Sequence, residues 1–347
     1  MTRELSMSEA IAEATVIAMR RDPNVFVMGV GVDDPAGIFG TTRLAHDEFG
    51  DARVFDVPIS ENCLTGMGVG AAISGMRPVL VHARDDFLLL TMDQLANHAA
   101  KWSYMSGGAF SVPLLVRAVI GRGWGQAAQH SQSLQAVVAH FPGLEVIMPA
   151  SPSDAKGLIL SALTGSAPVV CLEHRWCHGV RGDVPEGFYT TPIGRAHIER
   201  SGNDVTLVAL SQMVLEARKA AKTLEAEGVS CEIVDLRTVR PWDWETVCTS
   251  VHKTRRLVVA DTGWTHFGVG AEIAASVSAR LFGHLAAPVE CVGLPDVPTP
   301  CAPNLEAAYY PNAATVVQAV KRTLGQARVG GADDARAQHV KPFTGAF

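Results

Sequence analysis

The segment from Val54 to Pro78 has the sequence VFDVPISENCLTGMGVGAAISGMRP, and it carries the most informative pattern in this chain of 347 residues. It begins with a short β-rich run, turns at Pro58, and continues as a helix of small residues that starts near Glu61. A glycine in a helix interior costs about 1 kcal/mol relative to alanine. The many glycines therefore indicate that this helix packs closely against another surface, with Glu61 beside it.

Two interpretations of Glu61 are open. In the simpler one, Ser60 caps the helix and Glu61 favours the positive end of the helix dipole. The second rests on a resemblance. The segment Phe55–Glu61 (FDVPISE), followed by Gly-x-Gly-x-Gly-Ala-Ala and then by Gly-Met-Arg-Pro, closely resembles the β subunits (E1β chains) of thiamine-diphosphate-dependent 2-oxo acid dehydrogenases, which belong to the transketolase superfamily.

The resemblance implies a cofactor site around Glu61. In the family the matching glutamate contacts N1′ of the cofactor's aminopyrimidine, where a shared proton favours the 4′-imino tautomer, whose nitrogen removes the C2 proton of the thiazolium. Ala83 and Phe87 match residues that pack on the same pyrimidine, and Ile59 lies two residues before the glutamate. We therefore expect Glu61 to be catalytic and Ile59, Glu61, Ala83 and Phe87 to bind thiamine diphosphate.

A second candidate is His130, which follows a glycine-rich loop at residues 121–126. The loop lacks both the Walker lysine-serine pair and the dinucleotide fingerprint, so alone it predicts little. The tetrapeptide His130–Ser133 (HSQS) matches the E1β pattern, in which this histidine lies at the mouth of the active site and assists proton transfer and acyl transfer to a lipoyl arm. The simpler interpretation is a helix-capping histidine satisfied by the backbone.

The run His82–Asp86 (HARDD) departs from the family, because E1β chains usually have apolar or neutral residues there. Alternation along an extended segment would place Ala83 and Phe87 on one side and His82 and Arg84 on the other. Two interpretations are open. Arg84 could pair with a neighbouring aspartate at a subunit interface, or His82 and Arg84 could contact a polar substrate.

Strand and helix patterns alternate along the chain, which predicts largely parallel sheets covered by helices on both faces. We expect an α/β fold of two doubly wound domains. The boundaries are 1–185 for a pyrimidine-binding, transketolase-like domain, 186–203 for a linker, 204–327 for a transketolase C-terminal-like domain, and 328–347 for a loosely ordered tail.

Four local sequence patterns predict individual helices and strands. A capping box, Ser6–Glu9, opens the first helix, and Ser151-Pro152 caps another. Residues 88–105 have the spacing of one continuous helix, and residues 112–116 form an apolar run typical of a buried strand.

Composition limits the class of protein. A net charge of −6 argues against nucleic-acid or membrane partners, and 48% hydrophobic against 18% charged residues indicates a large subunit interface. Seven cysteines without a Cys-x-x-Cys pair favour neither a disulfide framework nor a zinc site. With neither a signal peptide nor a transmembrane segment in the pattern, we expect a cytoplasmic protein that forms an obligate oligomer.

One motif is missing. A complete thiamine enzyme needs Gly-Asp-Gly and an asparagine-rich turn to hold Mg²⁺ against the diphosphate, and no Gly-Asp-Gly occurs here. We expect no metal ligand on this chain, with Mg²⁺ held by a separate α subunit in an α2β2 heterotetramer. Some E1β chains bind potassium near residues 162–167, but Gly165 and Ala167 differ from their pattern, so the ion is left unassigned.

Three functions follow from these patterns. The first is the β subunit of an E1 component that decarboxylates a 2-oxo acid and passes the acyl group to a lipoyl-bearing E2 subunit. The second is the pyrimidine-side subunit of a split transketolase-like enzyme without a lipoyl partner. The third is a non-catalytic scaffold, against which the joint presence of Glu61 and His130 argues. The sequence leaves the 2-oxo acid open.

Overall fold

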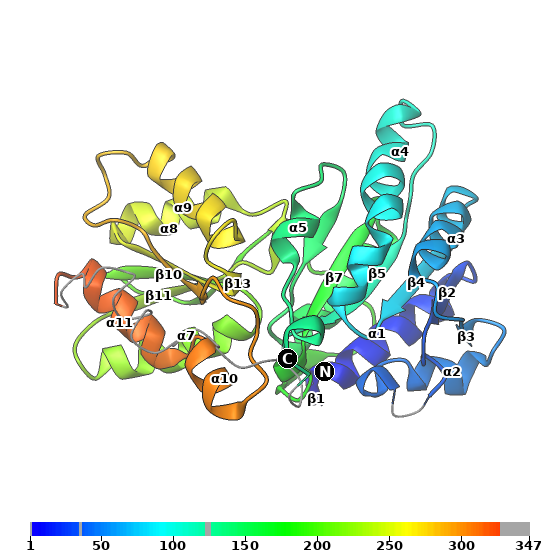
Figure 1. The fold of residues 1–347 in the computed structure, drawn as a ribbon, viewed down its shortest axis with the longest axis horizontal. Helices are drawn as coiled ribbons and strands as arrows, with labels where there is room; N and C mark the ends of the chain where they lie inside the picture. The colour runs from blue at the N-terminus through cyan, green and yellow to red at the C-terminus, as the bar shows by residue number, and fades with distance from the viewer. Residues whose placement is uncertain (1, 35–36, 122–125, 327–347) are drawn as a thin grey trace, which may run out of the picture.

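The computed structural model describes residues 2–34, 37–121 and 126–326. The predicted tail at 328–347 and residues 122–125 of the glycine-rich loop lie outside these described residues. Figure 1 shows two α/β domains side by side, the N-terminal one in blue to green and the C-terminal one in yellow-green to red.

The described strands are β1 Thr2–Ser6, β2 Val25–Gly29, β3 Val54–Asp56, β4 Arg77–His82, β5 Leu115–Ile120, β6 Glu145–Ile147, β7 Val169–His174, β8 Arg181–Pro185, β9 His197–Arg200, β10 Val205–Ala209, β11 Cys231–Asp235, β12 Thr238–Arg240, β13 Leu257–Trp264 and β14 Glu290–Leu294. The described α-helices are α1 Met7–Arg21, α2 Arg43–Phe49, α3 Glu61–Ile73, α4 Ala100–Met105, α5 Gln135–Ala139, α6 Pro152–Thr164, α7 Gln212–Glu225, α8 Trp244–Thr254, α9 Val269–Arg280, α10 Pro303–Tyr309 and α11 Ala313–Thr323.

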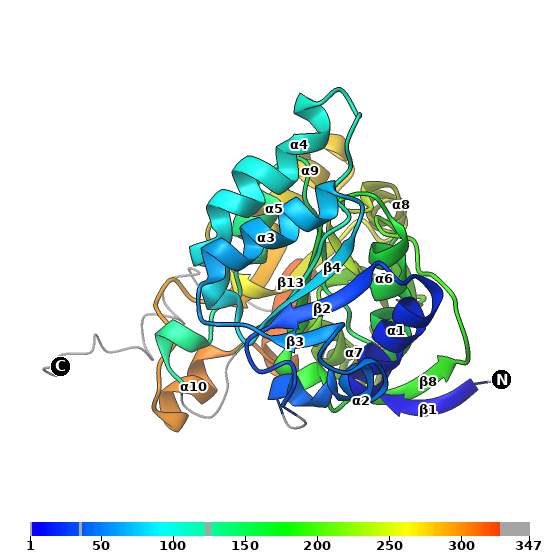
Figure 2. The same cartoon turned by 90° about the vertical axis from the view of Figure 1, so that its right-hand side faces the viewer.

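The first sheet has the strand order β12-β6-β7-β5-β4-β2-β3 and is parallel except for β12. Alternating side chains in its strands face opposite layers. Val25 and Val27 pack with α1 and α6, whereas Met28 packs with α3. Figure 2 shows α3 and α4 on one face of this sheet and α1 and α6 on the other. The carboxyl ends of β2 and β4 therefore lie next to the start of α3.

The second sheet has the order β14-β13-β10-β11-β9, and only its edge strand β9 is antiparallel. Helices α7 and α11 cover one face, and α8 and α9 cover the other. These two sheets, each covered on both faces, confirm the predicted two-domain α/β fold.

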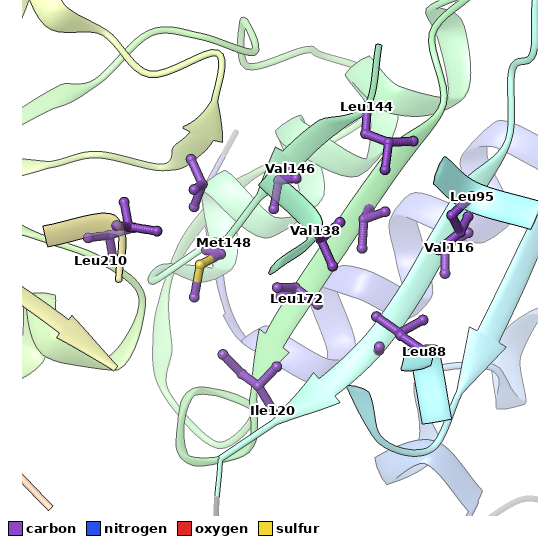
Figure 3. Packing of buried hydrophobic residues seen from close by; sticks show 14 of the residues in the cluster. Leu88, Leu95, Val116, Ile120, Val138, Leu144, Val146, Met148, Leu172 and Leu210 are labelled. Atoms are coloured by element: carbon purple, nitrogen blue, oxygen red, sulfur yellow. The ribbon is translucent and has the colours of Figure 1, made fainter. Parts of the chain in front are cut away.

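One hydrophobic cluster runs through both domains. Figure 3 shows part of it, including Leu210, which follows β10, and Met148, which follows β6. Strand β12 strengthens the connection, because Thr238 and Arg240 pair with β6 of the first sheet although they lie within the predicted second domain. The two domains thus share core residues and a strand pair, although the predicted boundaries themselves stay predictions.

Several local predictions are confirmed. Ser6 caps α1, and Glu9 completes the capping box in both directions. Ser151 caps α6 by accepting from the backbone N–H of Asp154. These signals depend only on neighbouring residues, which explains why they could be predicted.

Other predictions were wrong. Residues 88–105 do not form one regular helix, because a 3₁₀ helix at Asp85–Thr91 and a π-helical stretch at Asp93–Ala99 precede α4. Strand β5 begins at Leu115 rather than at residue 112. Pro113 has no backbone N–H to donate to a neighbouring strand, so the ladder starts after it. The linker bounds, 186–203, stay a prediction; strand β9 lies within them and pairs with β11.

No helix in the described ranges is long and apolar enough to cross a membrane.

Candidate active site

Glu61 is the first residue of α3, and the chain reaches it from β3 through the turn at Pro58. Ser60 occupies the N-cap position, but its side chain makes no capping hydrogen bond. The Ser60 cap of the simpler interpretation is therefore absent, while the position of Glu61 in the first turn still favours its charge electrostatically. In the single chain, Glu61 is half-buried.

A cavity of about 210 Å³ opens beside Glu61. It brings together all four predicted cofactor residues and adds His82 from the predicted substrate pair. Its walls come from β2, β4, α3 and the segments that follow these strands; the lining residues are Gly29, Val30, Ile59, Glu61, Leu64, Leu80, Val81, His82, Ala83 and Phe87.

The lining residues fit one aromatic ring of the expected cofactor. The volume lies below the roughly 300–1,000 Å³ of sites that enclose a whole drug-sized ligand, so the cavity suits part of a larger molecule. A Cβ on Gly29 would collide with the carbonyl oxygen of Val81, so only glycine permits this close approach of β2 and β4. One carboxylate in a mainly apolar wall suits a flat heterocycle with a basic ring nitrogen.

Ile59 is 79% exposed. A partner surface that covers Ile59 would close the cavity and exclude water from Glu61.

His82 is the second polar side chain of the cavity. It is 6% exposed, and its Nε2 has no hydrogen-bond partner among the described residues. Burial lowers the pKa of His82 to about 4, because the charged imidazolium is poorly solvated there. The imidazole is therefore neutral at physiological pH, and its Nε2 can form one hydrogen bond with a molecule in the cavity.

Arg84 points elsewhere. Its guanidinium donates to the carbonyl oxygen of Gly121 at 3.2 Å and to the side-chain oxygen of Gln126, and it does not line the cavity. The predicted alternation is wrong beyond His82, because the strand ends there and a 3₁₀ helix begins at Asp85. His82 therefore lines the same cavity as Phe87, and the substrate role of Arg84 stays a prediction that these contacts do not support.

His130 closes a short 3₁₀ helix, Ala128–His130, and is half-buried. Its ring meets Phe87 edge-on, with 5.8 Å between the ring centroids and 79° between the planes. Phe87 itself lines the cavity. His130 therefore lies one aromatic side chain away from the cavity, although it comes from a segment 69 positions after Glu61.

The structure also contains a buried charge network that sequence reasoning missed. Arg117 on β5 binds Glu173 on β7 through its Nε at 2.5 Å and also donates to Thr41, while His178 Nε2 lies 3.0 Å from Glu173. Burial alone would raise the pKa of Glu173, but Arg117 and His178 outweigh it and hold the pKa at about 2. The available signal was a lone arginine and a lone glutamate in two apolar strand patterns.

No group of three or more His, Cys, Asp or Glu side chains in the described ranges is arranged to hold a metal ion. In the segment considered for potassium, the carbonyl oxygens of Leu163 and Gly165 accept hydrogen bonds from Arg77.

Comparison with known proteins assigns the family. Residues 3–177 match the model described as "Transketolase, pyrimidine binding domain", and residues 194–316 match "Transketolase, C-terminal domain". The β subunit of an acetoin:2,6-dichlorophenolindophenol oxidoreductase from Cupriavidus necator is 41% identical, over 93% of this chain and 98% of the relative. The β subunit of a pyruvate dehydrogenase E1 component from Rickettsia felis is 41% identical, over 92% and 98%. The chain belongs to the E1β family.

This family membership confirms the resemblance drawn from Phe55–Glu61, and E1β chains are subunits of thiamine-diphosphate-dependent oxidoreductases. Among solved structures, a chain titled "Split gene transketolase, inactive beta4 tetramer" matches with a TM-score of 0.75 over 93% of this chain and 99% of that chain. Its sequence identity is 24%, so the match supports the fold and not the transketolase-like alternative.

Proposed function

We propose that this E1β chain works with a separate α subunit in an α2β2 heterotetramer, that the enzyme decarboxylates a 2-oxo acid, and that it passes the acyl group to a lipoyl-bearing E2 subunit. One observation carries this proposal: a single cavity contains Glu61 with Ile59, Ala83 and Phe87 around it. The match of residues 3–177 to a pyrimidine-binding domain supports the same assignment.

Each residue has a separate role in the proposal. When bound, thiamine diphosphate supplies a reactive thiazolium carbon and an electron sink for decarboxylation. Glu61 holds a proton at N1′ of the pyrimidine, while Ile59, Ala83 and Phe87 orient the ring and exclude water. His130, beyond Phe87, moves a proton at the mouth of the site and assists acyl transfer.

The diphosphate half of the site belongs to the α subunit in this proposal. Two phosphate groups require a hard cation with oxygen ligands, and this chain has no Gly-Asp-Gly motif. We therefore assign Mg²⁺ to the α subunit and the pyrimidine ring to this chain. A cytoplasmic location is proposed with it, since no disulfide joins any of the seven cysteines, all of which lie in the described ranges.

The substrate class in this proposal is a small or polar carbonyl compound. The relatives named above act on acetoin and pyruvate by name, and His82 adds a polar group to the cavity wall. An assay of the α2β2 enzyme with an artificial electron acceptor, run on pyruvate, acetoin and branched-chain 2-oxo acids, should rank the branched-chain acids last. A branched-chain preference would contradict this assignment.

The decisive variant is Glu61→Gln. The amide is nearly isosteric, so assembly with the α subunit should persist while decarboxylation falls by about two orders of magnitude or more, because the shared proton is lost. The matched control is Glu245→Gln, which makes the same change in the first turn of α8 at an exposed position. If both variants keep full activity, Glu61 only favours the helix dipole and the cofactor assignment fails.

A further inference from the structure

Three consecutive charged residues, Arg84, Asp85 and Asp86, are buried at the carboxyl end of β4. These three residues are 6%, 0% and 9% exposed. Burying charges in a row costs free energy unless each one has a partner. The partners therefore indicate what this run does.

All three residues bind one stretch of chain. Asp86 Oδ1 accepts from the side-chain amide of Gln132 at 2.7 Å, and Asp85 Oδ2 accepts from the backbone N–H of Leu134 at 2.9 Å. Arg84 donates to the side chain of Gln126 and to the carbonyl oxygen of Gly121 at the end of β5. We call residues 126–134 the His130 segment.

The next residue, Phe87, contacts His130 itself, with 5.8 Å between the ring centroids. Residues 84–87 thus contact the His130 segment on both sides of the histidine and at the histidine itself. The segment needs such support because Ala127 has a φ of 56° and a ψ of −159°, a region that is costly for a residue with a Cβ. Surrounding contacts must hold this conformation.

We propose that Arg84, Asp85 and Asp86 are positioning residues that hold the His130 segment, and with it the His130 imidazole, against Phe87 at the edge of the cavity. This inference rests on the proposed function only for the role of His130 in acyl transfer. It replaces the substrate contact predicted for Arg84 with a structural one that acts through His130.

The ionisation of the run agrees with this arrangement. Burial, and after it the neighbouring Asp86, raises the pKa of Asp85 well above its usual range, which favours the neutral form of its carboxyl group. This shift lessens the repulsion between the two adjacent carboxyl groups, which accept from Gln132 and Leu134.

The first test uses the α2β2 enzyme and two assays, dye-coupled decarboxylation and lipoyl acylation. Asp86→Ala removes the acceptor for Gln132 and should lower acylation about tenfold or more, because a displacement of about 1 Å can cost that much in rate, while decarboxylation changes little. Asp86→Asn keeps the Oδ1 acceptor and should restore acylation. The matched control is Glu272→Ala, which removes an exposed carboxylate bound to Ser276 at 2.8 Å.

A double-mutant cycle separates positioning from general damage. If Asp86 acts through His130, Asp86→Ala should have no further effect on acylation in a His130→Ala background. Additive losses would overturn the proposal, as would a single Asp86→Ala variant that acylates at the wild-type rate while His130→Ala does not.

The second test does not depend on catalysis. Hydrogen exchange of the peptide covering residues 127–139 should be faster in Asp85→Ala than in wild type, since the Leu134 N–H loses its acceptor. Exchange in the second domain serves as the folding control. Unchanged exchange at Leu134 would overturn the proposal whatever the activity. If hydrogen exchange becomes faster in Asp85→Ala but His130→Ala acylates at the wild-type rate, the role proposed for His130 in acyl transfer is wrong. The proposal that these residues hold the His130 segment is then still supported.

Discussion

The neutral state of His82 gives a quantitative prediction. His82 is 6% exposed, and its pKa is about 4 in the folded chain against 6.5 in the unfolded one. The unfolded chain therefore binds a proton in a pH range where the folded chain does not. Stability should fall as the pH drops from about 6.5 to about 4, by about 3 kcal/mol in all, of which about 2 kcal/mol is lost by pH 5.

The variant His82→Gln isolates the contribution of His82 to the pH dependence of stability, because glutamine keeps a polar side chain but cannot titrate. Urea unfolding of the full chain at pH 7.5 and pH 5 should show a loss of stability about 2 kcal/mol smaller in the variant than in wild type. Burial, His178 and Arg175 lower the pKa of His174 to about 3. The contribution of His174 to the loss of stability is the same in both proteins, so it cancels in the comparison.

The titration can also be observed directly. The imidazole ring signals of His82 in an NMR titration should stay at their neutral positions from pH 7.5 down to about pH 5. A midpoint near 6.5, or an identical pH dependence of unfolding in wild type and His82→Gln, would refute the argument from burial.

Three further outcomes are expected. His130→Ala should lower lipoyl acylation more than dye-coupled decarboxylation, and equal losses in both assays would indicate a general structural role. Glu173→Ala should destabilise the chain by about 3–5 kcal/mol in urea unfolding, because Arg117 is left buried without a counter-charge; a loss below about 1 kcal/mol would contradict this. His82→Phe should shift the substrate ranking toward aliphatic 2-oxo acids, whereas Arg84→Thr should leave the ranking unchanged; an effect of Arg84→Thr alone would restore its substrate role.

The convergence of Glu61 with Ile59, Ala83 and Phe87 was expected from motif positions alone, and the structure places these residues around one cavity. Their roles remain those of the proposal. The geometry could be anticipated because a parallel sheet aligns the carboxyl ends of its strands, so the segments that follow β2, β3 and β4, including the start of α3, lie at one edge.

The interpretation of residues 82–87 failed for a local reason. Alternation holds only while the backbone is extended, and the polar run turns into a 3₁₀ helix at Asp85. The sequence does not state where the strand ends, because charged residues are found both in loops and in buried clusters. Only the partners of Asp86 and Arg84, some 40 residues later in the chain, explain why these charges are buried.

The Arg117–Glu173 pair could not be predicted for a different reason. Its formation depends on β5 and β7 being neighbours, although β6 lies between them in the chain. The strand order is a tertiary property that local patterns do not encode. The pairing of β12 with β6 of the first sheet could not be predicted for the same reason.

The most direct test of the divided-site account is a calorimetric titration of thiamine diphosphate with Mg²⁺ into this chain alone and into its complex with the α subunit. The account predicts weak binding to the single chain, tight binding to the complex, and a melting temperature that rises with cofactor only when the α subunit is present. Tight Mg²⁺-dependent binding to this chain by itself would contradict the claim that it holds only the pyrimidine half of the site.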